Sequence, residues 1–385
     1  MKRVALLPPA TDGSLGDQAM MLASISELER QGVQSFHVLA YGKYPYLERM
    51  SQGSRSIEQT NILSYYPHAI DKGLDAVAEV SSKCDAFYCL GADVLDGQYS
   101  ETVSLLTLKI IECAAELLDR VVIQGCSFSE EPSRNCLNAL LRLPPKVVLC
   151  VRDSNSLSRL PWDLQRRARL VADLAFLLEP QDFNLCCGEM KPWLKKQRLD
   201  GRLILGLNLS YPSLRCSGLT ALNPLLDVFL DMIVRLADSL SCSFVFIPHD
   251  SRGPFSDAAL LDTLTQMLPA SVAPRCFLLP TDFTAAQVKG VVAELDLVIA
   301  GRMHLAIASL GQQTPVACLT YQGKFEGLFK HFHIDGLTLS PTQACHKERL
   351  FQFVEQAISR RDDIRRLIAT ALPTVSELAR ANFYS

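Results

Sequence analysis

The sequence lacks several features that define familiar protein classes. No apolar run approaches the roughly 20 residues that a membrane-spanning helix needs. The 38 basic and 41 acidic residues give a formal net charge of −3, without the basic excess typical of nucleic-acid-binding proteins. Neither the G-x-G-x-x-G fingerprint nor a P-loop lysine is present. We therefore expect neither a membrane span nor a nucleic-acid partner.

Cysteine is abundant, but its spacing fits no metal site. The 13 cysteines include no C-x-x-C pair, and Cys89, Cys150, Cys242 and Cys318 lie inside apolar runs. We interpret most of them as small buried hydrophobic residues of a reducing cytoplasm, with a disulfide framework as the alternative. No group of His and carboxylate residues shows metal-ligand spacing, so we expect no metal and no bound cofactor.

Composition and periodicity predict a two-domain α/β protein. Hydrophobic residues make up 48% and charged residues 21%, and 385 residues favour two domains over one. Short apolar runs alternate with amphipathic stretches, as in parallel sheets. The expected strands are 3–7, 35–40, 86–90, 120–124, 147–151, 170–172, 202–208, 243–247, 276–279, 297–300 and 316–320. The expected helices are 17–31, 99–118, 131–143, 154–160, 224–240, 257–267, 285–293 and 346–372.

A break in this alternation at 179–202 predicts the domain boundary. The segment contains two prolines and a basic cluster, which favours a solvated linker; contact with anionic lipid headgroups is the alternative. We expect an N-terminal domain over 1–185, a second domain over 200–345 and a helical segment over 346–385. Two doubly wound, Rossmann-like domains would face each other across a ligand-binding cleft.

The most informative motif is at residues 297–304. An apolar run ends at Gly301, and Arg302 and His304 follow just before a stretch of small residues. At the carboxyl end of a strand, backbone N–H groups and the helix dipole favour anions, so this pair predicts an anion clamp beside a proton donor. The alternatives are an ion pair between Arg302 and Asp296 or Glu294, and a helix-start histidine without chemistry.

Further strand ends carry weaker signals. Gly13, Ser14 and Gly16 follow the first strand, and Asp17 is placed to cap the next helix. The plain interpretation of this loop is a strand–turn–helix connection with a capped start.

Three more strand ends carry polar residues with two interpretations each. Gly91 and Asp93 follow the third apolar run, where Asp93 and the nearby Asp96 either hold a hydroxyl or cap a helix. Arg152 lies beside Asp153 and either forms a structural ion pair or lines the cleft. His249 ends a strand in the second half, as a ligand contact or as an ordinary loop histidine.

Taken together, these residues resemble the polysaccharide pyruvyl transferases. Any one match alone is weak, but their order and spacing are specific and run nearly end to end. The chain departs from the family pattern at Ser14, where Asn is frequent, and at residues 90–93, where many members have three glycines. The matching positions are 13–19, 124–125, 151–154, 172–176, 248–249, 301–304, Pro315, Tyr321, Lys324 and Gly327.

The resemblance implies an enzyme with a fold similar to GT-B glycosyltransferases. The cysteine usage favours the cytoplasm, and the basic segment gives a position peripheral to the inner membrane as the alternative. Phosphoenolpyruvate would be the donor, and a lipid- or nucleotide-linked sugar would accept a pyruvate ketal. His304 would be the general acid, Arg302 would contact the donor, and Asp17 is a candidate base by position only. The implied donor site is Arg302, Lys324, Tyr321, His249 and Gly301; the implied acceptor site is Gly13, Ser14, Gly16, Asp17, Gly91, Asp93 and Arg152.

Two other functions fit the same residues. A nucleotide-sugar glycosyltransferase or epimerase would use the same two-domain architecture, and fold alone does not separate it from a pyruvyl transferase. A glycan-binding relative without turnover is the third possibility, supported by the altered loop at residues 90–93. These alternatives differ in whether phosphoenolpyruvate, a nucleotide or only a glycan binds.

Overall fold

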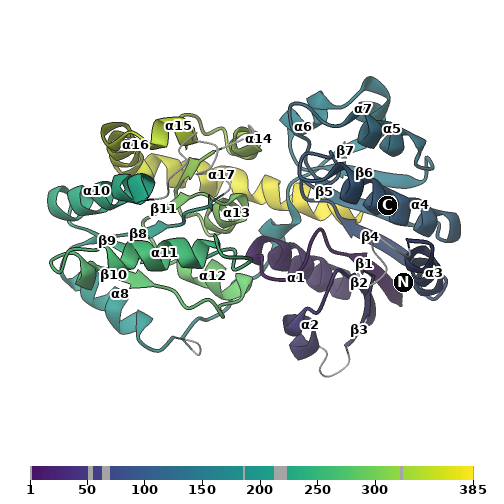
Figure 1. Ribbon diagram of the computed structural model, residues 1–385, viewed down its shortest axis with the longest axis horizontal. Coiled ribbons are helices and arrows are strands. Elements are labelled where there is room, and N and C mark those ends of the chain that lie inside the picture. The colour runs from purple at the N-terminus through teal and green to yellow at the C-terminus, as the bar shows by residue number, and fades with distance from the viewer. Residues whose placement is uncertain are drawn as a thin grey trace. The chain divides into compact units, whose positions relative to one another are not determined.

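The computed structural model describes residues 2–50, 55–62, 70–184, 187–211, 223–320 and 324–384. These residues form two compact units. The first contains Met1–Asp12, Asp17–Leu178 and Val375–Ser385, and the second contains Gly13–Gly16 and Glu179–Thr374. Each unit is an α/β domain built on one parallel sheet (Figure 1).

The first unit has a seven-stranded sheet in the order β3-β2-β1-β4-β5-β6-β7. All its strand pairs are parallel. The strands are β1 (Arg3–Leu7), β2 (Ser35–Ala40), β3 (Ser56–Asn61), β4 (Ala86–Leu90), β5 (Val121–Cys126), β6 (Val147–Val151) and β7 (Ala168–Leu170). The helices are α1 (Leu15–Arg30), α2 (Pro45–Met50), α3 (Ile70–Ser81), α4 (Glu101–Leu117), α5 (Arg134–Arg142), α6 (Ser154–Arg159) and α7 (Trp162–Arg167).

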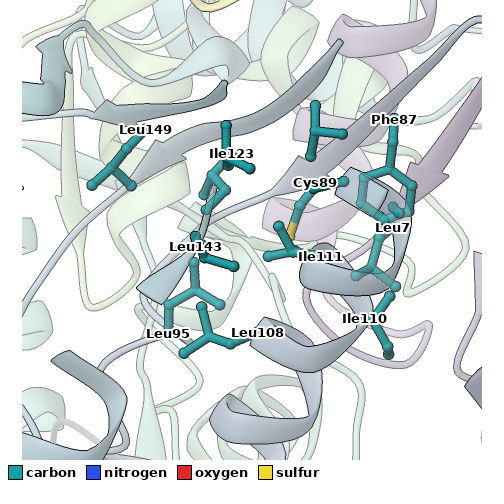
Figure 2. Packing of buried hydrophobic residues seen from close by; sticks show 14 of the residues in the cluster. Leu7, Phe87, Cys89, Leu95, Leu108, Ile110, Ile111, Ile123, Leu143 and Leu149 are labelled. Carbon is teal, nitrogen blue, oxygen red and sulfur yellow. The ribbon is translucent and has the colours of Figure 1, made fainter. Parts of the chain in front are cut away.

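Side chains from the central strands and from α4 form one core in this unit. Figure 2 shows Phe87 and Cys89 of β4 and Ile123 of β5 in this cluster, together with Leu108 and Ile111 of α4. All five are 2% exposed or less. The predominance of apolar residues in these strands follows from helices covering both faces of a parallel sheet. This buried layer fixes the strand ends from which the polar loops emerge.

The second unit repeats the arrangement with six parallel strands in the order β10-β9-β8-β11-β12-β13. Helices α10 and α16 pack together, and α12 packs against α13 (Figure 1). The strands are β8 (Leu203–Leu207), β9 (Cys242–Phe246), β10 (Cys276–Leu278), β11 (Leu297–Ala300), β12 (Val316–Leu319) and β13 (Thr338–Leu339). The helices are α8 (Met190–Leu199), α10 (Asn223–Ser239), α11 (Asp257–Gln266), α12 (Ala285–Val292), α13 (Met303–Gly311), α14 (Lys324–Lys330), α15 (Pro341–Ala344) and α16 (Lys347–Ser359). The last helix, α17 (Arg361–Arg380), begins in this unit and belongs to the first unit from Val375 onward.

The predicted fold class of two doubly wound parallel sheets is confirmed. The chain changes unit at Glu179, close to the expected boundary at 185. The C-terminal segment expected at 346–385 is not separate, because it divides at Val375 between the two units. Asn382, just beyond α17, explains why: its amide accepts a hydrogen bond from Gly125 N at 2.8 Å and donates one to Ala172 O at 2.9 Å.

The expected linker contains a helix, α8. Its Leu194 and Gln197 are buried, and Trp193 Nε1 donates to Pro274 O at 3.2 Å. The segment is therefore anchored to the second unit rather than being the solvated linker that its charge favours. Across the described residues, no helix has the length and apolar character that crossing a bilayer demands.

Candidate functional site

The strand order of the second unit places its candidate site. The strands are all parallel, but the order in which the chain adds them changes side between β8 and β11, which are neighbours in the sheet and not consecutive in the sequence. Ligands of open α/β sheets bind at the carboxyl ends of the strands beside such a switch point. Asn208 follows β8, His249 follows β9, and Gly301 and Arg302 follow β11. Residues far apart in the sequence therefore meet at one edge of one sheet.

Arg302 is held by a buried carboxylate at this edge. Its Nη2 donates to Asp257 Oδ1 at 2.7 Å, and its Nε lies 3.2 Å from both oxygens of Asp257. Asp257 is fully buried and also accepts from Asn208 Nδ2 at 2.9 Å and from His249 N at 3.2 Å. Burial raises the pKa of Asp257, while Arg302 and Asn208 act in the opposite direction. The network fixes the orientation of the Arg302 fork.

The ion-pair partners suggested for Arg302 by sequence are wrong. Asp296 instead accepts from Ile204 N at 2.8 Å, and Glu294 pairs with Arg198 at 3.0 Å. Sequence reasoning missed Asp257 because it lies 45 positions from Arg302. The available signal was Ser256, whose side chain caps α11 and so leaves Asp257 at the first position of a helix next to a strand end.

Asp250 adds a second carboxylate to the cluster. It accepts three hydrogen bonds from Arg252, from the backbone N and Nε at 3.0 Å and from Nη2 at 2.6 Å, and lies 3.4 Å from Arg302 Nη1. Hydrogen bonds from Arg252 and the charge of Arg302 hold the pKa of Asp250 low against the effect of burial. Two arginines and two carboxylates thus share the site, so their charges balance within the cluster.

His304 is the second residue of α13, and the backbone of Gly16 lies directly against its ring. A Cβ atom on Gly16 would come within 2.3 Å of His304 Nδ1. The loop Gly13–Gly16 forms backbone hydrogen bonds with the segment after β9. Leu15 N donates to His249 O at 3.0 Å, and Ser251 N donates to Gly13 O at 2.9 Å. Gly16 therefore permits a close approach that any other residue would prevent.

This packing corrects the expected placement of the loop. Gly13, Ser14 and Gly16 were assigned to the N-terminal domain, but they pack within the second unit, where Ser14 bridges Asp250. Asp17 also differs from expectation, because α1 begins at Leu15 and Asp17 lies inside its first turn instead of capping it. An acidic side chain there is stabilised by the helix dipole.

His249 is almost completely buried beside this cluster. Burial, together with the nearby His304 and Arg302, lowers the pKa of His249 from 6.5 to about 3. A neutral imidazole can donate through one ring nitrogen and accept through the other. His249 is therefore suited to a neutral contact with a ligand rather than to charge neutralisation.

In the first unit, Arg152 forms an ion pair with Asp173 and not with its sequence neighbour Asp153. Arg152 Nη1 donates to Asp173 Oδ2 at 2.7 Å, both side chains being 2% exposed, and Nε and Nη2 donate to Ser127 Oγ. Asp153 caps α6 by accepting from Ser156 N. Arg152 thus forms a structural ion pair, but its partner is Asp173 and not the Asp153 considered from sequence; a role in acceptor binding stays a prediction.

Gly91 and Asp93 follow the carboxyl end of β4 in the first sheet. A Cβ on Gly91 would lie 2.4 Å from Gln124 O, so this position needs glycine for close packing of β4 on β5. Asp93 Oδ2 accepts from Tyr99 Oη at 2.9 Å. Asp96 is buried and accepts from Ser129 N and Gln98 N, while Ser100 caps α4. Neither aspartate therefore caps the helix.

Two expected donor residues are not placed. Tyr321 lies outside the described residues, and the side chain of Lys324, the first residue of α14, is likewise not described. Among the residues that are, no three His, Cys, Asp or Glu side chains gather in a group that could hold a metal ion.

Comparison with known proteins decides the family. A family model described as polysaccharide pyruvyl transferase matches residues 15–323, which is most of the chain. The chain belongs to the polysaccharide pyruvyl transferase family. The match covers both strand-end clusters, including Arg152 and the Arg302–His304 pair. No curated protein sequence matches the chain.

Solved structures confirm the GT-B-like fold predicted for this pyruvyl transferase relative. Anabaena Alr3699/HepE, solved with UDP and glucose, has 14% identity and a TM-score of 0.58 over 100% of this chain and 95% of its own. Staphylococcus aureus MnaA, solved with UDP, has 10% identity and a TM-score of 0.65 over 99% and 94%. A putative UDP-N-acetylglucosamine 2-epimerase from Listeria monocytogenes has 12% identity and a TM-score of 0.64 over 98% and 94%.

Proposed function

We propose that this chain transfers pyruvate from phosphoenolpyruvate to two hydroxyls of one sugar, forming a ketal during exopolysaccharide or cell-surface glycan synthesis. The observation that carries the proposal is the pair Arg302 and His304 at the switch point of the second sheet, with Arg302 oriented by buried Asp257. Membership of the family supports the same reaction class.

The donor is a dianion or trianion with a carboxylate and a phosphate, and the second unit offers groups suited to it. A planar guanidinium binds either group through parallel N–H donors, and Asp257 preorganises that of Arg302. The amides that open α13 and its dipole also favour an anion. We propose donor contacts from Gly301, Arg302 and His249, and from Lys324 and Tyr321 by family resemblance.

His304 supplies the proton in the proposed mechanism. Its proton moves to the methylene carbon of the enol phosphate, so the neighbouring carbon becomes electrophilic and a sugar hydroxyl adds to it. Phosphate then leaves with its bonding electron pair, and the second hydroxyl closes the ketal. The two hydroxyls release two protons, of which one restores His304 and the other leaves with phosphate or solvent.

The acceptor side is assigned by family resemblance and position. We propose that Gly91, Asp93 and Arg152 of the first unit contact the sugar, with Gly13, Ser14 and Gly16 of the loop beside His304. Asp17 and Asp93 are the candidate bases for the attacking hydroxyl. The sugar would be carried on a lipid or a nucleotide, and the enzyme would act in the cytoplasm or at the inner membrane surface without a metal or bound cofactor.

One observation favours a second candidate function. The solved structures with the same fold include complexes with UDP. A nucleotide-sugar glycosyltransferase or epimerase would place nucleotide phosphates where we propose the donor phosphate, using the same α13 N-terminus.

The experiment that tests the proposal is phosphate release from phosphoenolpyruvate with a panel of lipid-linked and nucleotide-linked sugars. Mass spectrometry of the products should show one added pyruvate ketal per sugar. His304→Ala should abolish turnover while donor affinity changes only a few-fold, because the proton is transferred in the transition state. Turnover above a tenth of wild type in this variant would show that His304 is not the acid.

A further inference from the structure

Two buried hydroxyl groups beyond the carboxyl ends of β8 and β12 take no part in the hydrogen-bond network around Asp257. Within the described part of the chain, Ser210 Oγ and Thr320 Oγ1 are closed to solvent and make no hydrogen bond. The two residues are 1% and 8% exposed. A buried hydroxyl without a partner destabilises a folded protein, and such groups are rare. Two of them at one sheet edge are both able to bond a ligand group that reaches this edge.

Both residues flank the strand that leads into α13. A Cβ on Gly301 would lie 3.0 Å from Ser210 N and 3.1 Å from Ser210 Cβ, so Ser210 lies against the backbone that opens this helix. On the other side, Ala300 is opposite Cys318 in the register of β11 and β12. Thr320 is two residues beyond that pair, at the level where Arg302 leaves the sheet.

We propose that Ser210 and Thr320 form a phosphate subsite at the N-terminus of α13. A hydroxyl donates one hydrogen bond to an anionic oxygen, and a tetrahedral phosphate presents oxygens toward both flanking strands and the helix at once. The positive end of the nine-residue helix α13 adds to the attraction. This subsite rests on the proposed function in that the phosphate would be that of phosphoenolpyruvate.

Asn208 has a similar atom but does not belong to the subsite. Its Oδ1 is buried without a partner in the described residues, while Nδ2 donates to Ile247 O and Asp257 Oδ2, both at 2.9 Å. With both amide hydrogens committed, Asn208 can only accept a hydrogen bond, and the dianionic phosphate ester of phosphoenolpyruvate has no hydrogen to donate. Of these three side chains, the two hydroxyls therefore suit that anion.

Substitutions that remove one hydroxyl with little change of shape test the subsite. Calorimetric titration of the full-length protein with inorganic phosphate should give an affinity that falls about tenfold or more in Ser210→Ala and in Thr320→Val, because each loses a bond to a charged group. The melting temperature of the ligand-free variants should stay equal to wild type or rise, because an unpartnered buried group has been removed. Weaker binding with unchanged or higher stability is the signature of a ligand-binding role.

Two matched controls come from the same unit. Ser309 Oγ donates to Leu305 O at 2.9 Å, and Thr314 Oγ1 donates to Val292 O at 2.8 Å. Ser309→Ala and Thr314→Val remove hydroxyls that already have partners, so they should lower the melting temperature and leave phosphate affinity unchanged. This is the opposite pattern from the two subsite variants.

The subsite would be overturned if the wild type bound no phosphate, if both variants kept wild-type phosphate affinity, or if the variants lost pyruvate binding with phosphate binding intact. The last result would assign the hydroxyls to a carboxylate. Failure of the proposed function looks different, since phosphate would bind and respond to the variants while no sugar consumes phosphoenolpyruvate. Turnover that is insensitive to both variants would retain the function and reject the subsite.

Discussion

Arg302 is the residue whose behaviour depends most on what surrounds it. Sequence position marks it as an anion-binding residue at a strand end, and the structure shows that Asp257 already engages its Nε and Nη2. An arginine fixed this way loses less side-chain entropy when it binds a substrate, which is the benefit of preorganisation. The bidentate geometry also distinguishes it from lysine, whose single ammonium group cannot reproduce the fork.

Arg302→Lys should therefore weaken phosphoenolpyruvate binding by about tenfold or more, although the charge is kept. Isothermal titration calorimetry measures the change. Arg235→Lys is the control, because Arg235 pairs with Asp231 and Glu348 on α10 and α16, away from the strand ends. Equal affinity in wild type and Arg302→Lys would restrict Arg302 to a structural ion pair.

At the scale of elements, apolar patterning predicted most central strands and the helices between them. β1, β2, β4, β6 and β11 have the expected bounds because buried parallel strands are continuous apolar runs. β3 was missed because it is a partly exposed edge strand with the polar sequence SIEQTN. Patterning therefore predicts buried elements well and exposed edges poorly.

The candidate site was predictable to a smaller degree. The sequence predicted which residues follow the ends of strands, because each apolar run is followed by a polar loop. Their partners could not, because Asp257 and Arg302, or Arg152 and Asp173, meet only after the sheet has formed. The position of Gly13–Gly16 beside His304 also depends on tertiary packing that no local pattern records.

The short segment after α17 helps to hold the first unit together. Asn382 is fully buried and bonds Gly125 N, Ala172 O and Ala379 O. Asn382→Ala should lower the free energy of unfolding by about 2–4 kcal/mol, because buried backbone groups lose their partner. Denaturant unfolding measures this, with exposed Asn135→Ala as the control. A loss no larger than that of the control would contradict this account of the C-terminal segment.

For the whole molecule, buried His249 makes stability depend on pH. Its pKa is about 3 in the folded protein against 6.5 for the free side chain, so between these values only the unfolded chain binds the proton. Stability should therefore fall as the pH is lowered from about 6.5 toward 3, by up to about 1.4 kcal/mol per pH unit. Denaturant unfolding of His249→Gln should show a shallower slope than wild type. Parallel pH profiles would contradict the assignment.

The second unit should bind phosphoenolpyruvate rather than a nucleotide. The most direct test is a thermal-shift titration of the whole protein with phosphoenolpyruvate and, in parallel, with UDP, GDP and CMP. A ligand that binds only the folded state raises the melting temperature by mass action. We expect stabilisation by phosphoenolpyruvate alone, reduced in Arg302→Lys. Stabilisation by a nucleotide, with no response to phosphoenolpyruvate, would contradict the account and assign the Arg302–His304 cluster to a nucleotide-sugar enzyme.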